Sequence, residues 1–495
     1  YGSYLGVGDS RHICVVTTYH AAFGRFAVRP TGSSKYREAA HRRTVPPPAM
    51  RRETPLPAGR LSPAVTVIGV DDTDSRERGM CTTYLAARIA ERIEAAGGSV
   101  DERLLVRLNP AVERKTRGNA ALAIHTDLDA DAAADIAREE LEPLAEIDDP
   151  RTSPGLVVAD CAPDDVPDAV AGFASEAVRE RHDLEDALGL IDDAGFEAEG
   201  WAGGYGRIGA LAAVGAARAF SEWTHELIAY REFERCGTPR EVDEESLFAA
   251  AADAYPDAWD TVDREEGEAV CVPSAPGPIL YGIRGDDPEA IREVADGIES
   301  EPVERTAQFR TNQGTDAHLR DAAVNDLGDL RDGHAYHVGC VVVGEPETRE
   351  GGHVFVPVRA IDGDDAAGAT IDAAAFEPTK RFRDRVRALR AGDELTICGE
   401  VSDGALKLEK FAVRALNRTE RTTPICPDCG NTMSSAGRGQ GYRCRDCDTS
   451  APGKVEREVE RDLERGWYEV PPCARRHIAK PLVRGGFDAP THPER

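Results

Sequence analysis

Three aspartates stand close together in the stretch VTVIGVDDTDS, residues 65–75. Asp71, Asp72 and Asp74 come directly after an apolar run that has the length and the β-branched content of a buried strand. Carboxylate oxygens are the ligands that Mg²⁺ prefers, and the ion often shares them with nucleotide phosphates. The stretch therefore predicts a magnesium and phosphate site at the end of a strand, with a merely solvated acidic turn as the alternative.

A helix is expected directly after this loop. From Thr82 to Ile93 apolar residues recur at helical spacing, and a Gly-Gly pair at 97–98 ends the segment. The start of a helix carries free N–H groups and the positive end of the helix dipole, which suits a phosphate. The hydroxyl groups of Thr82 and Thr83 at this start either cap the helix or accept a phosphoryl group.

Basic residues connect the next two expected strands, 104–106 and 120–124. In this connection Lys115, Arg117 and Asn119 are candidates for contact with a phosphate or with RNA. The alternative is a hairpin-like connection with exposed strand edges, although loops carry functional residues disproportionately often.

A glycine cluster, WAGGYGRIGALAAVG at residues 201–215, precedes an alanine-rich helix. Glycine lets a backbone approach a phosphate closely and frees N–H groups to bind it. The candidate phosphate-binding residues are Gly203, Gly204, Gly206, Arg207 and Gly209. A turn with tight helix packing is the alternative.

A polar loop in the middle of the chain is suited to binding a substrate. The loop RTNQGTDAH, residues 310–318, is dense in side chains that donate and accept hydrogen bonds, which suits a guanidinium group or a nucleotide, with a solvated turn as the alternative. Its candidates are Arg310, Asn312, Gln313, Thr315 and Asp316.

Two basic stretches stand out in an acidic chain and predict contacts with an RNA backbone. A charge-laced solvated helix is the alternative for the first stretch. The candidates are Arg381, Arg383, Arg385 and Arg387 in the first stretch, and Arg475, Arg476 and Lys480 near the C-terminus.

Four cysteines, Cys426, Cys429, Cys444 and Cys447, form two C-x₂-C pairs separated by fourteen residues. This spacing is typical of a zinc ribbon, in which four thiolates fill the tetrahedral coordination and leave no open position. We therefore expect a structural zinc ion, with a redox dithiol as the alternative.

Composition limits the class of protein. The 495 residues contain 60 Lys and Arg against 89 Asp and Glu, for a net charge of −29, and only seven of the basic residues are lysine. Dense acidic surface keeps a chain soluble in concentrated salt, so we hypothesise a halophilic archaeal host. Scattered cysteines beside one metal site indicate reduced thiols and a cytoplasmic location, and no apolar run is long enough to span a membrane.

We expect several domains to position these groups, because a chain of this length does not fold around a single hydrophobic core. Residues 1–63 carry ten basic and three acidic residues without clear periodicity. We expect a disordered extension here, with a basic nucleic-acid-binding arm or a transit peptide as the alternatives. Short strands with an intervening helix over 333–417 predict a five-stranded OB-fold barrel. The zinc ribbon is expected at 424–450, and a tail that contacts RNA at 451–495.

Several of these stretches together resemble the archaeal tRNA-isoleucine 2-agmatinylcytidine synthetases. The similar motifs are GVDDTDS with GMCTTYLA, RLNP with KTRGNAA, the glycine cluster, YGIRG and FRTNQGTDAHL. The resemblance implies an α+β multidomain protein, with a kinase-like α/β catalytic domain at 64–232 and a ferredoxin-like domain at 233–332 before the OB fold and the ribbon.

The resemblance also implies the reaction. An enzyme of this family uses ATP, converted to AMP, to attach agmatine to C2 of the wobble cytidine in the isoleucine tRNA with a CAU anticodon, which then reads AUA. It assigns Mg²⁺-ATP to the three aspartates, phosphate stabilisation to Lys115, Arg117 and Arg207, and a phosphorylated threonine to Thr82, with Thr83 as the alternative. Agmatine is assigned to the 310–316 loop.

Two other functions stay open at the level of the sequence. One is an ATP-dependent kinase that acts on a small molecule, and the other is a non-catalytic OB-fold and zinc-ribbon protein that binds nucleic acid. RNA-dependent ATP hydrolysis would favour the synthetase over both.

Overall fold

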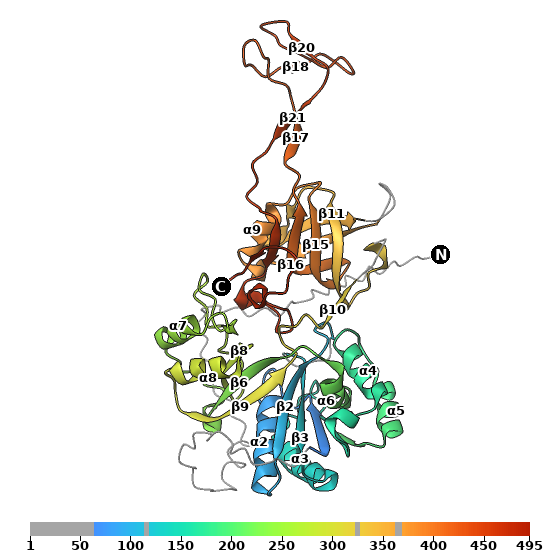
Figure 1. The fold of residues 1–495 in the computed structure, drawn as a ribbon, viewed down its shortest axis with the longest axis vertical. Helices are drawn as coiled ribbons and strands as arrows, with labels where there is room; N and C mark the ends of the chain where they lie inside the picture. The colour runs from blue at the N-terminus through green and yellow to red at the C-terminus, as the bar shows by residue number, and fades with distance from the viewer. Residues whose placement is uncertain (1–63, 113–117, 322–326, 362–368) are drawn as a thin grey trace, which may run out of the picture.

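The computed structural model describes residues 64–112, 118–321, 327–361 and 369–495, and the expected extension at 1–63 lies outside them. Figure 1 shows three parts along the long axis of the molecule: an α/β part, a β-barrel, and a small tip carried on two thin strands. No helix in the described part of the chain is both long enough and apolar enough to span a membrane.

A single nine-stranded sheet runs through the α/β part. In sheet order its strands are β5 (Glu197–Gly200), β4 (Gly155–Ala159), β1 (Thr66–Asp71), β3 (Ala120–Thr126), β2 (Val100–Arg107), β9 (Val303–Thr311), β6 (Thr224–Arg231), β8 (Ile279–Gly285) and β7 (Ala258–Trp259). Neighbouring strands are antiparallel throughout, except at the junction of β2 and β9.

Helices cover both faces of this sheet. They are α2 (Thr82–Ala95) and α3 (Ala130–Leu144) on one face, α4 (Asp168–Ala177), α5 (Leu184–Ala194) and α6 (Gly206–Ala219) on the other, and α7 (Glu244–Asp253) and α8 (Pro288–Gly297) beside β6 and β8. Because successive side chains of a strand point to opposite faces, Ile68 and Val70 pack towards α2 while Val67 packs towards α6.

The two halves of the sheet meet along a narrow seam. β2 and β9 pair in parallel through only two residue pairs, Leu104 with Arg310 and Leu105 with Thr311. By contrast, β6 pairs with β9 along almost its whole length and also with β8. The boundary expected at 232/233 therefore falls between strands that belong to the same half of the sheet.

The barrel contains the five strands that an OB fold requires. They are β11 (Ala335–Val342), β13 (Val354–Ala360), β14 (Thr370–Ala375), β16 (Ala405–Ala415) and β15 (Glu394–Ser402). Each pairs with the next, and β15 pairs again with β11, which closes the barrel. The five-stranded barrel that the sequence predicts over residues 333–417 is therefore present. The basic stretch forms the short helix α9 (Phe382–Arg387).

The last thirty residues return to the barrel. β22 (Gly466–Glu469) pairs with β16, and β23 (Thr491–His492) pairs with β22. Two short strands extend the same sheet elsewhere, β10 (Leu319–Asp321) beside β11 and β12 (Glu347–Thr348) beside β13. We call residues 466–495 the C-terminal segment. It is packed against the barrel and is not a loose tail.

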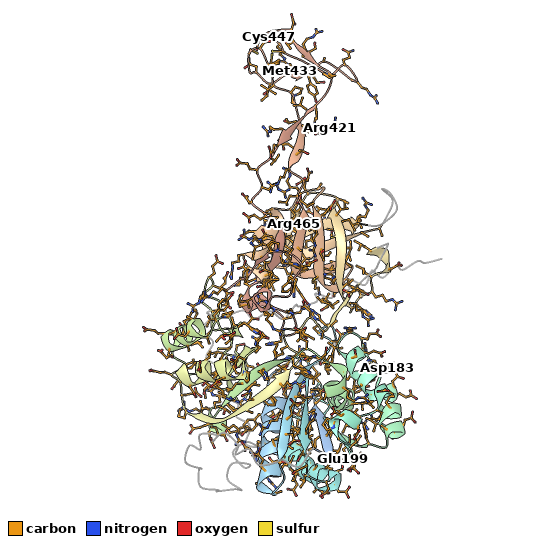
Figure 2. All side chains as sticks on the ribbon, viewed as in Figure 1. Asp183, Glu199, Arg421, Met433, Cys447 and Arg465 are labelled. Atoms are coloured by element: carbon orange, nitrogen blue, oxygen red, sulfur yellow. The ribbon has the colours of Figure 1, made fainter. Side chains whose placement is uncertain are left out.

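A two-stranded stalk carries the tip. It consists of β17 (Thr419–Thr422) and β21 (Val455–Glu458), and the tip contains β18 (Ser434–Ser435), β19 (Tyr442–Arg443) and β20 (Ser450–Ala451). Figure 2 shows Arg421 on the stalk and Met433 and Cys447 in the tip, away from the barrel. The tip therefore has a small core of its own, built around Cys426, Cys444 and Met433.

Candidate active site

The acidic loop is built as the sequence predicts. β1 ends at Asp71, and α2 begins at Thr82 after a turn that contains Gly79. Asp72 has a left-handed backbone with φ 57°, a conformation that is strained in most residues other than glycine and that clusters at functional sites. The surrounding structure must therefore hold this loop in place.

The segment between α3 and β4 provides that support. The backbone N–H of Glu146 donates to the carbonyl of Thr73 at 3.0 Å, and the hydroxyl of Thr152 donates to the carbonyl of Asp74 at 2.7 Å. Ser75 Oγ lies 2.6 Å from Asp149 Oδ2. These bonds fix the backbone of the acidic loop and leave its aspartate side chains to other roles.

Crowding of buried negative charge dominates the electrostatics of the loop. Burial, followed by the charge of Asp72, raises the pKa of Asp71 well above its ordinary value. Burial raises the pKa of Asp72 to about 7, with Asp74 and Asp149 adding to the rise and the N–H of Ser153 opposing it. Asp72 Oδ1 is buried without a hydrogen-bond partner among the described residues. A bound cation would relieve all of these penalties.

The carboxylates fit a magnesium ion only in part. Among the described residues, no set of three or more acidic or histidine side chains lies close enough to share one ion, and only the four cysteines do. Mg²⁺ usually binds one or two carboxylates together with phosphate oxygens and water. The geometry suits that mode better than a site made of three carboxylates.

Ser153 connects the acidic loop to the glycine cluster. Its backbone N–H donates to Asp72 Oδ2 at 2.9 Å, while its hydroxyl accepts from the N–H of Tyr205 at 3.0 Å and lies 3.0 Å from the carbonyl of Ala202. α6 starts here, and a Cβ on Gly209 would lie only 2.0 Å from Asp71 Oδ2. The structure thus brings Asp71 and Asp72 together with the expected phosphate-binding loop.

Within that loop Arg207 folds back on the glycines. Its Nε donates to the carbonyl of Gly204 at 3.0 Å, and its guanidinium also reaches the carbonyl of Gly203 at 3.5 Å. The N–H of Gly206 donates to the carbonyl of Ser153. Phosphate contact by these residues stays a prediction.

A cleft with about 1040 Å³ of empty space, partly open to solvent, lies on the other side of the acidic loop. Its polar lining comes from distant parts of the chain: Asp74, Ser75, Thr82, Thr83, Arg107, Glu226, Arg240, Arg284 and His477. We call this cleft the catalytic cleft. It contains both threonines that the sequence singled out, together with residues that sequence reasoning did not find.

The two threonines lie differently at the start of α2. Thr82 Oγ1 accepts a hydrogen bond from the hydroxyl of Thr73 at 3.0 Å, whereas Thr83 Oγ1 lies 3.0 Å from the sulfur of Cys81. Neither side chain caps the helix, because the residue at the cap position is Cys81. Both threonines therefore line the cleft wall without capping the helix.

Arg107 and Glu226 face each other across the seam. Arg107 donates to the carbonyl of Gly118 and to Gln313 Oε1, each at 3.1 Å, and its guanidinium lies 3.9 Å from Glu226 Oε2. Gln313 donates in turn to Glu226. The side chain of Asn312 bonds to both the N–H and the carbonyl of Arg107.

The 310–316 loop therefore acts mainly inside the protein. Asn312 and Gln313 are fully buried, Arg310 pairs with Glu102 at 2.8 Å, and Thr315 donates to the carbonyl of Asn312. The carboxylate of Asp316 accepts a hydrogen bond from Lys410 Nζ at 2.7 Å. Direct contact of this loop with agmatine stays a prediction, but its clear role is to hold Arg107 and the barrel.

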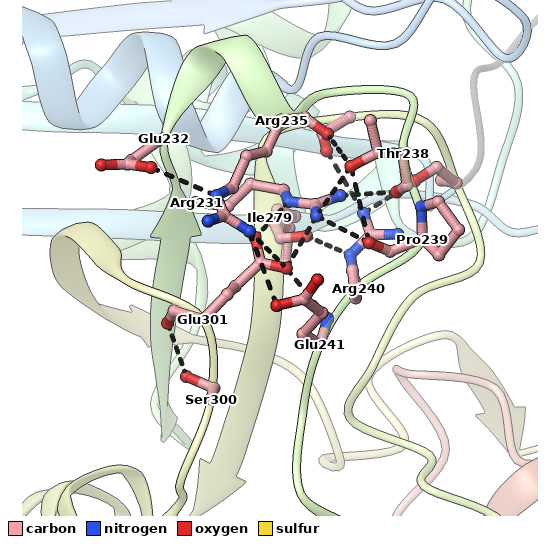
Figure 3. Close-up of polar contacts among 12 residues, drawn as sticks. Arg231, Glu232, Arg235, Thr238, Pro239, Arg240, Glu241, Ile279, Ser300 and Glu301 are labelled. Carbon is pink, nitrogen blue, oxygen red and sulfur yellow. Dashed lines mark hydrogen bonds and ion pairs between the residues drawn. The ribbon is translucent and has the colours of Figure 1, made fainter.

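A buried ion pair supports the opposite wall of the cleft (Figure 3). Arg231 and Glu301 are fully buried and meet at 2.7 Å, and Arg231 also donates to the carbonyls of Thr238 and Pro239. The next residue, Arg240, donates to the carbonyl of Ile279 at 2.7 Å and lines the cleft. The ion pair thus fixes the loop that carries Arg240.

Most of the expected RNA-binding arginines make contacts within the chain. Arg381 pairs with Asp263 and Glu494, and Arg475, which is almost fully buried, pairs with Asp260 and Glu469. The others follow the same pattern: Arg383 with Gly352, Arg385 over the ring of Tyr468, Arg387 with Asp384, Arg476 with Glu400 and Lys480 with Glu222. RNA contact by them stays a prediction.

Three other predicted residues need separate mention. Lys115 and Arg117 lie outside the described residues. Asn119 donates to the carbonyl of Asn109 at 2.6 Å and has a left-handed backbone. Its visible role is to shape the connection between β2 and β3, so its contact with ATP stays a prediction.

The four cysteines converge as expected. Their sulfur atoms all lie within 4.8 Å of one another, with Cys426 and Cys444 buried and Cys429 and Cys447 exposed. Four thiolates at this spacing match the ligand set of a tetrahedral zinc ion.

Family models match three regions of the chain. They are described as the TiaS TCKD domain, over residues 67–128, the TiaS FLD domain, over 204–318, and the TiaS C-terminal zinc ribbon domain, over 423–463. The third match confirms the predicted zinc ribbon.

Curated relatives match nearly the whole chain. A protein of Haloquadratum walsbyi, the isoleucine-tRNA 2-agmatinylcytidine synthetase TiaS, is 57% identical over 465 residues, which cover 87% of this chain and 100% of that relative. Its namesake from Methanocaldococcus jannaschii is 36% identical over 84% of this chain and 97% of the relative.

Solved structures share the fold. The complex of TiaS with its isoleucine tRNA and ATP aligns with a TM-score of 0.79 at 40% identity, over 87% of this chain and 99% of that one. The complex of TiaS with the same tRNA, AMPCPP and agmatine aligns with a TM-score of 0.76 at 38% identity, over 87% and 99%. These alignments extend over the catalytic cleft and the barrel alike.

Proposed function

Because this chain belongs to the family of isoleucine-tRNA 2-agmatinylcytidine synthetases, we propose that it attaches agmatine to C2 of the wobble cytidine of isoleucine tRNA, using ATP. The observation that carries the proposal is the catalytic cleft, which brings arginine, acidic and threonine side chains together in one space. Neither a small-molecule kinase nor a purely RNA-binding protein has comparable support, since relatives with this name match the chain from the acidic loop to the ribbon. The haloarchaeal relative also fits the hypothesis of a halophilic host.

The chemistry requires activation of a poor leaving group. The oxygen at C2 of cytidine departs only after it has received a phosphoryl group derived from ATP. The primary amine of agmatine then forms the C2–N bond and loses a proton, while the C2–O bond breaks and the oxygen leaves with phosphate. Such transfers depend mainly on positioning and on electrostatic stabilisation.

The residues of the cleft divide by charge. Arg107, Arg240 and Arg284 suit the phosphoryl group and its transition state. Glu226 suits a cationic end of agmatine. Thr82 is our candidate for the phosphorylated threonine, with Thr83 as the alternative, because both hydroxyls line the same wall.

Mg²⁺ and ATP belong at the acidic loop. Asp72, with its unpartnered Oδ1, and Asp71 or Asp74 would hold Mg²⁺ together with the phosphates. When bound, the ion would neutralise charge on the transferred phosphoryl group. The glycine loop and Arg207 would cradle the remaining phosphates, and Ser153 would keep that loop in register with Asp72.

The remaining parts would bind the tRNA. We assign a structural zinc ion to the four cysteines and RNA contact to the barrel, the ribbon and the C-terminal segment. The kinase-like description of residues 64–232, the ferredoxin-like description of residues 233–332, the CAU anticodon and a cytoplasmic location belong to the same proposal.

Nucleoside mass spectrometry tests the proposal. Isoleucine tRNA is incubated in molar salt with the purified protein, ATP and agmatine, and its nucleosides are analysed. We expect a cytidine that is heavier by agmatine minus water. An unmodified cytidine, from a protein shown to be folded and to bind the tRNA, would overturn the proposal.

A further inference from the structure

One buried amide connects two opposite charges of the catalytic cleft. Arg107 and Glu226 both line the cleft. The side chain of Gln313 accepts a hydrogen bond from Arg107 at 3.1 Å through its Oε1 and donates one to Glu226 through its Nε2. A guanidinium group only donates hydrogen bonds and a carboxylate only accepts them. Only one orientation of the amide therefore satisfies both partners.

Gln313 itself is fully buried and is not among the described residues that line the cleft. Its carbonyl accepts a hydrogen bond from the hydroxyl of Thr224, at the start of β6, at 2.9 Å. Its N–H donates to Thr311 Oγ1, at the end of β9, at 3.2 Å. The backbone of Gln313 is thus fixed to two strands of the same half of the sheet. An effect of its side chain on the reaction has to pass through Arg107 and Glu226.

The backbone of Arg107 is fixed to the same half of the sheet. The side chain of Asn312 accepts from the N–H of Arg107 at 2.7 Å and donates to its carbonyl at 3.0 Å. These two bonds continue the short ladder between β2 and β9 beyond its last pair, Leu105 with Thr311. The distance between the two charged groups is therefore set by side chains on a fixed backbone.

That distance is slightly too long for a direct pair. The guanidinium of Arg107 lies 3.9 Å from Glu226 Oε2, and the two side chains are only 12% and 8% exposed. Opposite charges attract strongly where so little water reaches them. In direct contact, at about 2.8 Å, an arginine and a carboxylate form a strong pair in which each neutralises the other. Gln313 gives each of them a hydrogen bond while they stay apart.

The second carboxylate oxygen of Glu226 lies against a glycine of the cleft wall. A Cβ on Gly282 would lie only 2.9 Å from Glu226 Oε1, and Gly282 lines the cleft. The missing side chain leaves room for this oxygen. Gln313 thus holds the carboxylate at one oxygen, while the other oxygen lies beside the wall of the cleft.

We propose that Gln313 is a positioning residue that prevents direct pairing of Arg107 with Glu226, so that Arg107 serves the phosphoryl group and Glu226 a cationic end of agmatine. The inference rests on the proposed function. The cleft has to hold opposite charges a few ångströms apart for substrates of opposite charge. A side chain at position 313 that cannot bridge them would let the two groups neutralise each other, and both roles would fail together.

Steady-state agmatinylation of isoleucine tRNA by Gln313→Met, alone and combined with Glu226→Gln, tests the proposal. Methionine fills a similar volume but does not bridge the two charges. We expect kcat to fall about tenfold and KM for agmatine to rise about tenfold in Gln313→Met, because the direct pair occupies both groups. Adding Glu226→Gln removes the carboxylate that binds Arg107. In the double variant kcat should therefore recover at least half of its loss on a logarithmic scale, while KM for agmatine stays high.

Gln308→Met is the matched control. Gln308 lies on β9, and its Oε1 is buried without a partner among the described residues, but it is not among the residues that line the cleft. It should leave both kinetic constants unchanged. Thermal midpoints and zinc content establish that each variant is folded. If Gln313→Met does not fold, Gln313→Asn replaces it, because its amide is too short to reach both partners, and it should show the same pattern, including the recovery.

The outcomes separate the two levels of the proposal. A wild-type enzyme that leaves cytidine unmodified overturns the proposed function and this inference with it. With an active wild type, an unaffected Gln313→Met, an unchanged KM for agmatine, or a kcat that Glu226→Gln does not restore overturns only the role of Gln313. Recovery of kcat supports it, because a purely structural role predicts that a second buried substitution adds to the loss.

Discussion

The acidic loop and the C-terminal segment are both dense in buried charge, but they hold it in opposite ways. In the loop, Asp71 and Asp72 lie beside further carboxylates, and their pKa values rise. In the segment, Arg475 lies between Asp260 and Glu469. Buried charges of one sign without opposite partners, as in the loop, indicate a binding site for a ligand from outside the chain. Buried charges paired with opposite ones, as in the segment, belong to the packing of the fold.

Asp72→Asn tests the uncompensated side of this comparison. We expect ATP turnover to fall by about a hundredfold or more, because the variant removes a charge that would bind Mg²⁺-phosphate. The unfolding midpoint should not decrease, since a repulsive charge is lost. Turnover, tRNA binding and thermal melting measure the three effects.

Asp148→Asn serves as its control, because Asp148 is 71% exposed and pairs only loosely with Arg78. It should leave turnover unchanged. If Asp72→Asn retained activity, the assignment of Mg²⁺-ATP to this loop would be wrong.

Arg475→Met tests the compensated side. The variant leaves Asp260 and Glu469 buried without their guanidinium partner, and breaking a buried pair in this way costs about 3–5 kcal/mol. We expect the free energy of unfolding, measured by denaturant titration in molar salt, to fall by this amount. A change below about 1 kcal/mol would mean that the anchor contributes little.

Glu409→Gln extends the comparison to pH. Burial raises the pKa of Glu409, but His318, Arg476 and Lys410 outweigh it, and the pKa falls to about 2 from an ordinary 4.5. A carboxyl group whose pKa is lowered on folding stabilises the fold at any pH above its pKa in the unfolded state. This stabilisation is lost as the pH falls from 4.5, the ordinary pKa, through about 2, the pKa in the folded protein. The wild type should therefore lose its advantage over Glu409→Gln in acid, as melting curves at a series of pH values would show. An advantage independent of pH would contradict this.

Arg387→Gln should have the smallest effect on stability. Its partner Asp384 is largely exposed, and exposed ion pairs contribute about 0.5 kcal/mol or less. Denaturant titration checks this, and filter binding in the same salt shows whether tRNA affinity falls independently. A stability loss as large as that of Arg475→Met would remove the distinction between surface and buried compensation.

The sequence was sufficient where the chemistry is local. The strand, acidic loop and helix around Asp72 lie within about thirty residues, and the cysteine spacing alone predicts the zinc ribbon. It was insufficient for the grouping of Arg107, Glu226 and Arg240, because these residues meet only through the pairing of distant strands.

The basic stretches show the opposite limit. A sequence reports the charge of Arg475 but not the position of Asp260, which lies more than two hundred residues earlier and becomes its partner only in the fold. His477 carried no signal at all, since one histidine in a basic stretch attracts no notice until the fold places it at the wall of a cleft.

The narrow seam between β2 and β9 has a mechanical consequence. Two residue pairs join the halves of the sheet there, whereas longer ladders join the strands on either side. Under tension across the sheet, this line bears the load on fewer backbone bonds than the ladders on either side of it. Tyr84 and Tyr230 make an edge-to-face contact beside the seam, with ring centres 5.3 Å apart, and this contact also joins the two halves. Force applied to the two halves would therefore open the molecule beside the catalytic cleft.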